Sequence, residues 1–139
     1  MKKFIAAAAL LLSAQWSYAD IIVDNAYVPQ VPPGSMAYAA YLSITNSGAE
    51  ARTVVGISSP VFGMTHLHHT MMKDGVSSMK SIDKLVIEPG NTVTLQPGGM
   101  HIMLMKPAED VMAAGMVPIK LEFKDGEIIE FNVSIRTLN

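Results

Sequence analysis

Histidine and methionine, the residues of this chain best suited to bind a metal ion, are concentrated in one segment. All four His lie between positions 66 and 101, and seven of the ten Met that follow residue 1 lie between 64 and 105. Met commonly fills irregular gaps in a hydrophobic core, so one isolated Met would indicate packing alone. Clustering of both residue types in one third of the chain favours a shared binding role.

The spacing within this segment suits a β-strand with one metal-binding face. His101, Met103 and Met105 alternate with Ile102 and Leu104. Since successive side chains of a strand point to opposite faces, the two apolar residues are expected in the core and the other three outside it. A His and a Met two positions apart lie roughly 6–7 Å apart along the backbone, so both can reach one ion.

A second run, residues 64–72, supplies further candidate ligands. His66 and His68 share one face of the expected strand, and Leu67 and His69 share the other. Imidazole nitrogens and thioether sulfurs without a carboxylate or thiolate form a soft site, which suits Cu(I) well, zinc poorly, and calcium or magnesium hardly at all. Because imidazole binds metals in its neutral form, we expect binding to weaken below about pH 6.5.

Composition excludes several other kinds of function. The chain has no Cys, which excludes disulfides, thiolate zinc sites and a cysteine nucleophile. Its net charge of -2 excludes a general nucleic-acid binder. It contains no Gly-x-Ser-x-Gly nucleophile elbow, no phosphate-binding glycine loop and no His-Glu-x-x-His zinc motif. We therefore predict a protein that is not an enzyme.

The first nineteen residues have the order of a secretory signal peptide. Lys2 and Lys3 precede a short apolar run, and small residues end the segment at Ala19. The apolar run is much shorter than the roughly 20 residues of a membrane-spanning helix, which disfavours the alternative of an uncleaved anchor. We expect cleavage after Ala19, export to the periplasm, and one mature domain over residues 20–139 with 8 basic and 12 acidic residues.

The mature chain is predicted to be all-β. Short alternating apolar runs are separated by turn signals every 8 to 12 residues or so, which is typical of a sandwich or barrel. The clearest pair is 117–123 and 127–136, joined by a hairpin turn at Lys124-Asp125-Gly126. One helical turn is expected within 108–115. No repeat or linker divides the chain, so we expect a single domain.

The spacing of four residues resembles the signature of a known family. His68, Met79, His101 and Met103 form the pattern His-x10-Met-x21-His-x-Met, which is similar to that of the periplasmic copper chaperones called PCu(A)C. The resemblance continues through 39–46, 74–76, 89–90, 95–99 and 101–105. It implies a cupredoxin-like Greek-key β-sandwich that binds Cu(I) through these four residues and delivers it to the copper A centre of cytochrome oxidase.

The chain also departs from the family pattern. Ser77 stands where the family often has another Met, and His66 and His69 are additional imidazoles beside His68. We include His66 and Met72 as auxiliary ligand candidates. Many relatives carry a His- and Met-rich C-terminal tail, and we expect no such site in this chain.

The resulting prediction is a monomeric Cu(I) chaperone of the periplasm. Its partner would be a copper-accepting protein, such as cytochrome oxidase subunit II or another copper chaperone. We expect the protein to bind no nucleic acid and to have no membrane span after cleavage. Three alternatives remain open at this point. They are a copper buffer without a dedicated acceptor, an exported copper enzyme, and a metal-free β-sandwich interaction module whose Met residues are core filler.

Overall fold

Alternation of apolar and polar residues produces β-strands along most of the chain. The computed structural model describes residues 16–18, 20–108 and 111–137. The strands in these ranges are β1 (Trp16–Tyr18), β2 (Ile21–Pro29), β3 (Ala37–Asn46), β4 (Arg52–Ser58), β5 (Phe62–Lys73), β6 (Val76–Ile82), β7 (Leu85–Ile87), β8 (Thr92–Leu95), β9 (Met100–Pro107), β10 (Met116–Phe123) and β11 (Ile128–Arg136). The short helix α1 (Val111–Ala114) lies within the predicted helical turn.

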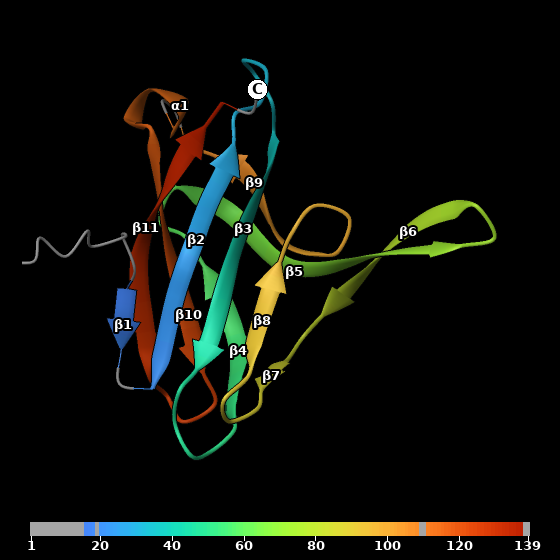
Figure 1. The fold of residues 1–139 in the computed structure, drawn as a ribbon. Coiled ribbons are helices and arrows are strands. Elements are labelled where there is room, and N and C mark those ends of the chain that lie inside the picture. The colour runs from blue at the N-terminus through green and yellow to red at the C-terminus, as the bar shows by residue number, and fades with distance from the viewer. Residues whose placement is uncertain (1–15, 19, 109–110, 138–139) are drawn as a thin grey trace, which may run out of the picture.

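The strands are connected in one continuous hydrogen-bonded path (Figure 1). Its order is β6-β5-β9-β3-β2-β11-β10-β4-β7, with β1 added to β2 and β8 added to β3. β2 and β11 pair in parallel, whereas the other pairs are antiparallel. β3 changes partner along its length, because residues 37–40 pair with β9 and residues 42–45 pair with β8. This change lets the path turn from one layer of the fold into the next.

One hydrophobic core holds these layers together. Buried apolar side chains from β2, β3, β9, β10 and β11 belong to a single cluster. The predicted hairpin forms, with Lys120 opposite Glu130 and Leu121 opposite Ile129. Leu121 and Ile129 are fully buried, as the alternation predicted. The expected all-β fold is therefore confirmed.

Most of the predicted signal peptide lies outside the described residues. Residues 1–15 and Ala19 are among those not described, and residues 16–18 pair with 21–23 as the short strand β1. Cleavage after Ala19 therefore stays a prediction. Within the described residues, no helix has the length and apolar character needed to cross a bilayer.

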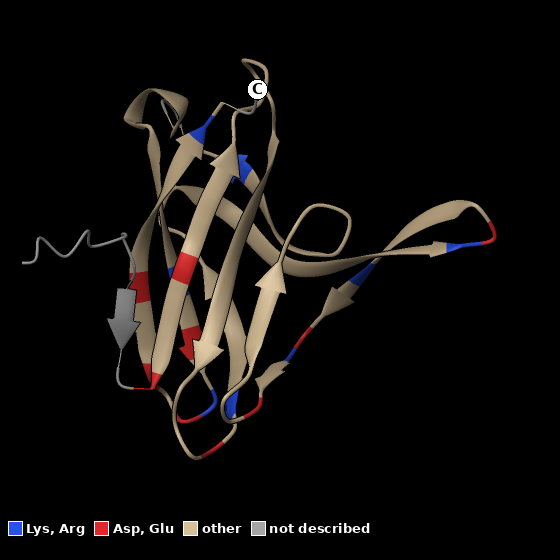
Figure 2. Ribbon diagram, in the orientation of Figure 1, with Lys and Arg blue, Asp and Glu red and all other residues tan. Residues whose placement is uncertain are grey.

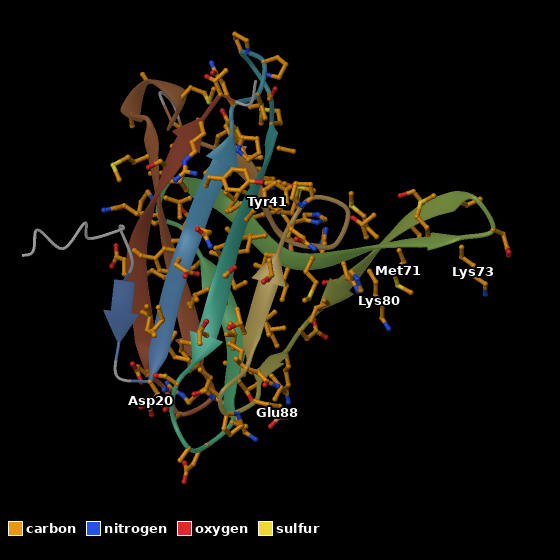
Figure 3. The ribbon with its side chains drawn as sticks, viewed as in Figure 1. Asp20, Tyr41, Met71, Lys73, Lys80 and Glu88 are labelled. Carbon is orange, nitrogen blue, oxygen red and sulfur yellow. The ribbon has the colours of Figure 1, made fainter. Side chains whose placement is uncertain are left out.

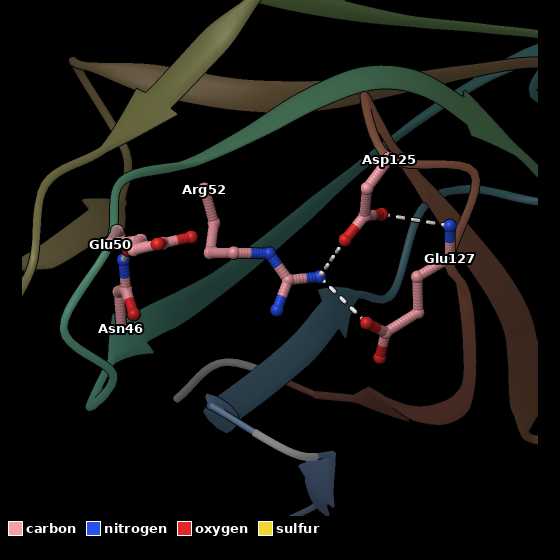
Figure 4. Close-up of polar contacts among 5 residues, drawn as sticks. All are labelled: Asn46, Glu50, Arg52, Asp125 and Glu127. Atoms are coloured by element: carbon pink, nitrogen blue, oxygen red, sulfur yellow. Dashed lines mark hydrogen bonds and ion pairs between the residues drawn. The ribbon is translucent and has the colours of Figure 1, made fainter.

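Charged residues lie at several places on the fold, including the projecting hairpin of β5 and β6 (Figure 2). Many lie in the loops at one end of the fold, where Arg52 contacts both Asp125 and Glu127 (Figure 4). The Arg52 guanidinium also lies 4.6 Å from the centre of the Phe123 ring. These contacts join β4 to the β10–β11 hairpin, at a distance from the projecting loop of β5 and β6.

Asn46 is the most deeply buried polar residue at this end of the fold. Its side-chain NH2 donates to the carbonyl oxygens of Glu50 and Ile87 at 2.7 and 2.9 Å, and its side-chain oxygen accepts from the Gly48 N–H. The side chain thereby satisfies backbone groups of the β3–β4 turn and of β7.

We predict that Asn46→Ala lowers the free energy of unfolding by about 1–3 kcal/mol, because it leaves buried backbone groups without partners. Chemical denaturation of the apo protein measures this loss. Thr92→Ala is the matched control, since it removes a hydrogen bond to Thr45 at an exposed position. An Asn46→Ala variant as stable as the Thr92→Ala variant would contradict the assigned role.

Candidate metal centre

The pairing of β5 with β9 brings the two predicted ligand runs together. His68 lies directly opposite His101, and His66 lies directly opposite Met103. Directly opposed side chains of antiparallel strands point to the same face, with Cβ atoms roughly 4.5–5.5 Å apart. Three imidazoles and one thioether therefore occupy two neighbouring rows on one face of the sheet.

The opposite face of the same strands belongs to the core. Leu67 and Ile102 oppose each other there, and Leu67, Ile102 and Leu104 are all buried. His69 lies on this face too, but beyond the end of the core, and is exposed. The predicted division of the two strands into an apolar face and a His/Met face is confirmed.

His101 is unusual because it is an imidazole on the outer face that is nevertheless only 5% exposed. Its Nδ1 makes a long, 3.5 Å hydrogen bond to the carbonyl oxygen of Gly99, in the turn that precedes β9. A carbonyl accepts only, so in the neutral ring this contact favours the tautomer with its proton on Nδ1 and a free lone pair on Nε2. That Nε2 is buried and has no hydrogen-bond partner among the described residues.

His68 presents a second buried nitrogen beside the first. Its Nδ1 also lacks a hydrogen-bond partner within the described part of the chain. The His68 and His101 rings meet edge to face with centroids 5.8 Å apart, and the His66 ring stacks on His68 at 5.9 Å. Burying a polar atom without a partner costs free energy. A metal ion between the two rings would supply that partner to both nitrogens.

The environment of His68 favours its neutral form. Burial lowers the pKa of the His68 imidazole below its usual value of 6.5, and the neighbouring His101 and His66 lower it further. Each cause acts against the positive charge of the protonated ring. The neutral, metal-binding form of His68 therefore persists to lower pH than that of an ordinary histidine.

We predict an NMR titration midpoint for His68 in the apo protein below 6.5, and a midpoint closer to 6.5 in His101→Ala, which removes burial and a neighbouring charge. The folded state binds a proton at His68 less readily than the unfolded state does. Protonation of His68 therefore lowers the free energy of unfolding as the pH falls from 6.5 through the lowered pKa. A His68 midpoint that does not move in His101→Ala would contradict this coupling.

Met72 belongs to β5 and Met79 to β6. The hairpin of these two strands projects from the body of the fold, as the labelled Met71, Lys73 and Lys80 show (Figure 3). Met79 lies opposite Thr70, one row beyond His68 and on the same face, and is 59% exposed. Met72 lies opposite Ser77, a further row toward the tip, about 13 Å along the strand from His68. Met79 is thus a diagonal neighbour of His68, whereas Met72 is remote from both buried nitrogens.

The donor set around these histidines lacks hard ligands. β5, β6 and β9 contain no Asp or Glu. Within the described ranges, no group of three His, Asp or Glu side chains is arranged to hold a metal ion. Two imidazoles alone leave a metal site incomplete, and the thioethers of Met103 and Met79 are soft donors on the same face that could complete it. Such a set is chemically suited to Cu(I).

Tyr41 lies on the face of β3 that continues the face of the centre, a position that the sequence did not reveal. Ala39 and Ala40 of β3 oppose Met103 and Ile102 of β9. Tyr41 follows them on the face of Ala39 and Met103, toward the His101 end. Its ring lies 5.4 Å from that of Tyr27, and burial together with Tyr27 raises its pKa. The periodicity of the sequence could not place Tyr41 on this face, because β3 and β9 pair although they are far apart in the sequence.

Comparison with known proteins shows the family of this chain. Residues 21–135 match the family model described as putative lipoprotein LpqE-like. The chain belongs to the LpqE-like family. This member is 33% identical over 104 residues to the putative lipoprotein Lxx21020 of Leifsonia xyli subsp. xyli, and 31% identical over 102 residues to the uncharacterized protein RP573 of Rickettsia prowazekii. The alignments cover 74% and 73% of this chain but only 63% and 56% of those relatives.

Solved structures place this LpqE-like protein in the PCuAC fold. The copper-bound PCuAC domain from PmoF2 superposes with a TM-score of 0.74 at 16% identity, covering 90% of this chain and 99% of that domain. The solution structure of CuI-DR1885 from Deinococcus radiodurans has a TM-score of 0.64 at 30% identity, covering 81% and 75%. The predicted resemblance to PCu(A)C proteins and the cupredoxin-like β fold are confirmed.

Proposed function

We propose that this LpqE-like protein binds one Cu(I) ion tightly and passes it to a copper-accepting protein. The tight site consists of His68, His101 and Met103, with Met79 completing it from the projecting hairpin. The proposed role is to bind and transfer copper, without catalysis.

One observation supports this proposal over the alternative functions. Two buried imidazole nitrogens, His68 Nδ1 and His101 Nε2, have no hydrogen-bond partner in the described part of the chain. They lie on directly opposed residues. A thioether, Met103, occupies the neighbouring row of the same face. A soft metal ion bound between the two rings would give both nitrogens a partner, which a metal-free interaction module would not.

The named relatives support the choice of metal. The compared structures include a copper-bound domain and a Cu(I) form of DR1885. Their ion is carried over to this chain because its own donors are imidazoles and thioethers, which suit Cu(I). The exposed Met79 adds a functional argument, since a ligand on a projecting hairpin can leave the ion while an acceptor's ligands enter.

The test is an anaerobic titration of the purified protein with Cu(I) in the presence of a competing chelator. We expect one tightly held equivalent in the wild type, and loss of this equivalent in His101→Ala. Circular dichroism of the same samples checks that the variant is folded. A folded wild-type protein that takes no Cu(I) from the chelator would overturn the proposal.

Delivery is distinguished from buffering by a transfer assay. The copper-loaded protein is mixed with apo subunit II of cytochrome oxidase, or with another copper chaperone, and the copper on each protein is measured after separation. Faster transfer than from a Cu(I)–chelator complex of equal affinity supports a chaperone. Transfer no faster than from that complex supports a copper buffer instead.

The proposal places this function in the periplasm, with residues 1–19 as the export signal. It is supported by the charged, apolar and small-residue order of that segment. The lipoprotein descriptions of the family and of the Leifsonia relative are consistent with export. Fractionation of cells expressing the full chain, with mass analysis of its N-terminus, tests both the compartment and cleavage after Ala19.

A further inference from the structure

The face that carries the proposed copper centre continues beyond it with a second group of soft ligands. One row past the His66–Met103 pair, Met64 of β5 lies directly opposite Met105 of β9. Their Cβ atoms are therefore roughly 4.5–5.5 Å apart on the same face as His66. His66 is two residues from Met64 along β5, so its imidazole is within reach of an ion held by both sulfurs.

Packing does not account for these two methionines. Met100 and Met112 pack against the hydrophobic core as partly buried residues. Met64 and Met105 are neither in that core nor packed against it within the described ranges, and Met64 is 39% exposed. Their thioethers lie instead on the outer face, in line with the imidazoles.

The neighbouring strand leaves this end of the face open. Ala37 of β3 opposes Met105 and Ala39 opposes Met103, so β3 places only methyl groups directly opposite these two methionines. At the other end of the same face, His101 is only 5% exposed. The outer face thus changes from a buried end at His101 to an accessible end at Met64.

We propose that Met64, Met105 and His66 form a second, weaker site for a soft monovalent cation, with Cu(I) as its physiological ligand. Two thioether sulfurs and one imidazole nitrogen provide a three-coordinate set, and no carboxylate of β5 or β9 competes for a harder ion. The site adjoins the tight centre through the His66–Met103 row but uses none of its four proposed ligands. It goes beyond the proposed function and does not require the tight site to be loaded.

The experiment is an anaerobic Cu(I) titration of the full chain, with 13C-methyl labelling of Met to follow each thioether by NMR. We expect two equivalents in the wild type. The second should bind more weakly and move the methyl signals of Met64 and Met105. The double variant Met64→Leu/Met105→Leu keeps apolar side chains of similar size and should bind only the first equivalent.

Met112→Leu/Met116→Leu is the matched control, because it removes one partly buried and one exposed Met from outside this face. It should retain both equivalents. Saturation of the wild type at one equivalent, or two equivalents in Met64→Leu/Met105→Leu, would overturn the second site. His101→Ala separates the two proposals, since it should lose the tight equivalent and keep the weaker one that shifts Met64 and Met105.

Discussion

Replacing His101 by Ala should weaken Cu(I) binding on the order of 100-fold or more, because losing a direct ligand exceeds the roughly 10–100-fold cost of losing an outer-shell group. His68→Ala should have a comparable effect. Both residues have a buried nitrogen without another partner in the described chain. Each substitution therefore removes a bond to Cu(I) that no other group replaces. Competition titrations against a Cu(I) chelator measure the change.

The other two histidines serve as internal controls. His69 lies on the opposite face of β5, so His69→Ala should leave Cu(I) affinity nearly unchanged. The His66 ring stacks on His68, but neither of the two buried nitrogens without a partner in the described chain belongs to His66. We therefore expect His66→Ala to weaken Cu(I) binding at the tight site only about 10-fold. Apo melting curves must accompany the titrations, since His101 is buried. Abolished binding in His69→Ala with retained binding in His68→Ala would show that β5 has a different register from the one described.

The second large effect is selectivity for Cu(I) over Zn(II). The wild type should prefer Cu(I) by a wide margin, because zinc binds thioethers poorly and this centre offers no thiolate or carboxylate. Met103→His should narrow the preference by at least about 10-fold, since it exchanges a thioether for an imidazole that zinc accepts. Parallel competition assays with Cu(I) and Zn(II) measure the ratio.

Met116→Leu is a suitable control for this measurement, because it alters an exposed Met of β10 that is away from the centre. It should leave the ratio unchanged. Equal affinity of the wild type for Zn(II) and Cu(I) would contradict the assignment of a soft-metal site, whatever the effect of Met103→His.

The types of residue and their local alternation determined the class of fold and indicated a soft-metal site. Alternation in 117–123 and 127–136 predicted a hairpin with one buried face, and the structure has that hairpin. The absence of Cys and the gathering of His and Met pointed to soft-metal chemistry. The hairpin prediction succeeds because pleating depends on neighbours two positions away, and the metal prediction rests on ligand preference, which is a property of the residues themselves.

The tertiary structure decided which side chains meet. That His68 opposes His101, that Tyr41 joins this face, and that Met64 pairs with Met105 all follow from the pairing of β5, β9 and β3. The burial of His101 depends equally on these distant strands. Local sequence cannot fix such pairing, because a slip of one residue moves every side chain of a strand to the other face. Only the shared core, through residues such as Leu67 and Ile102, selects the register that brings the ligands together.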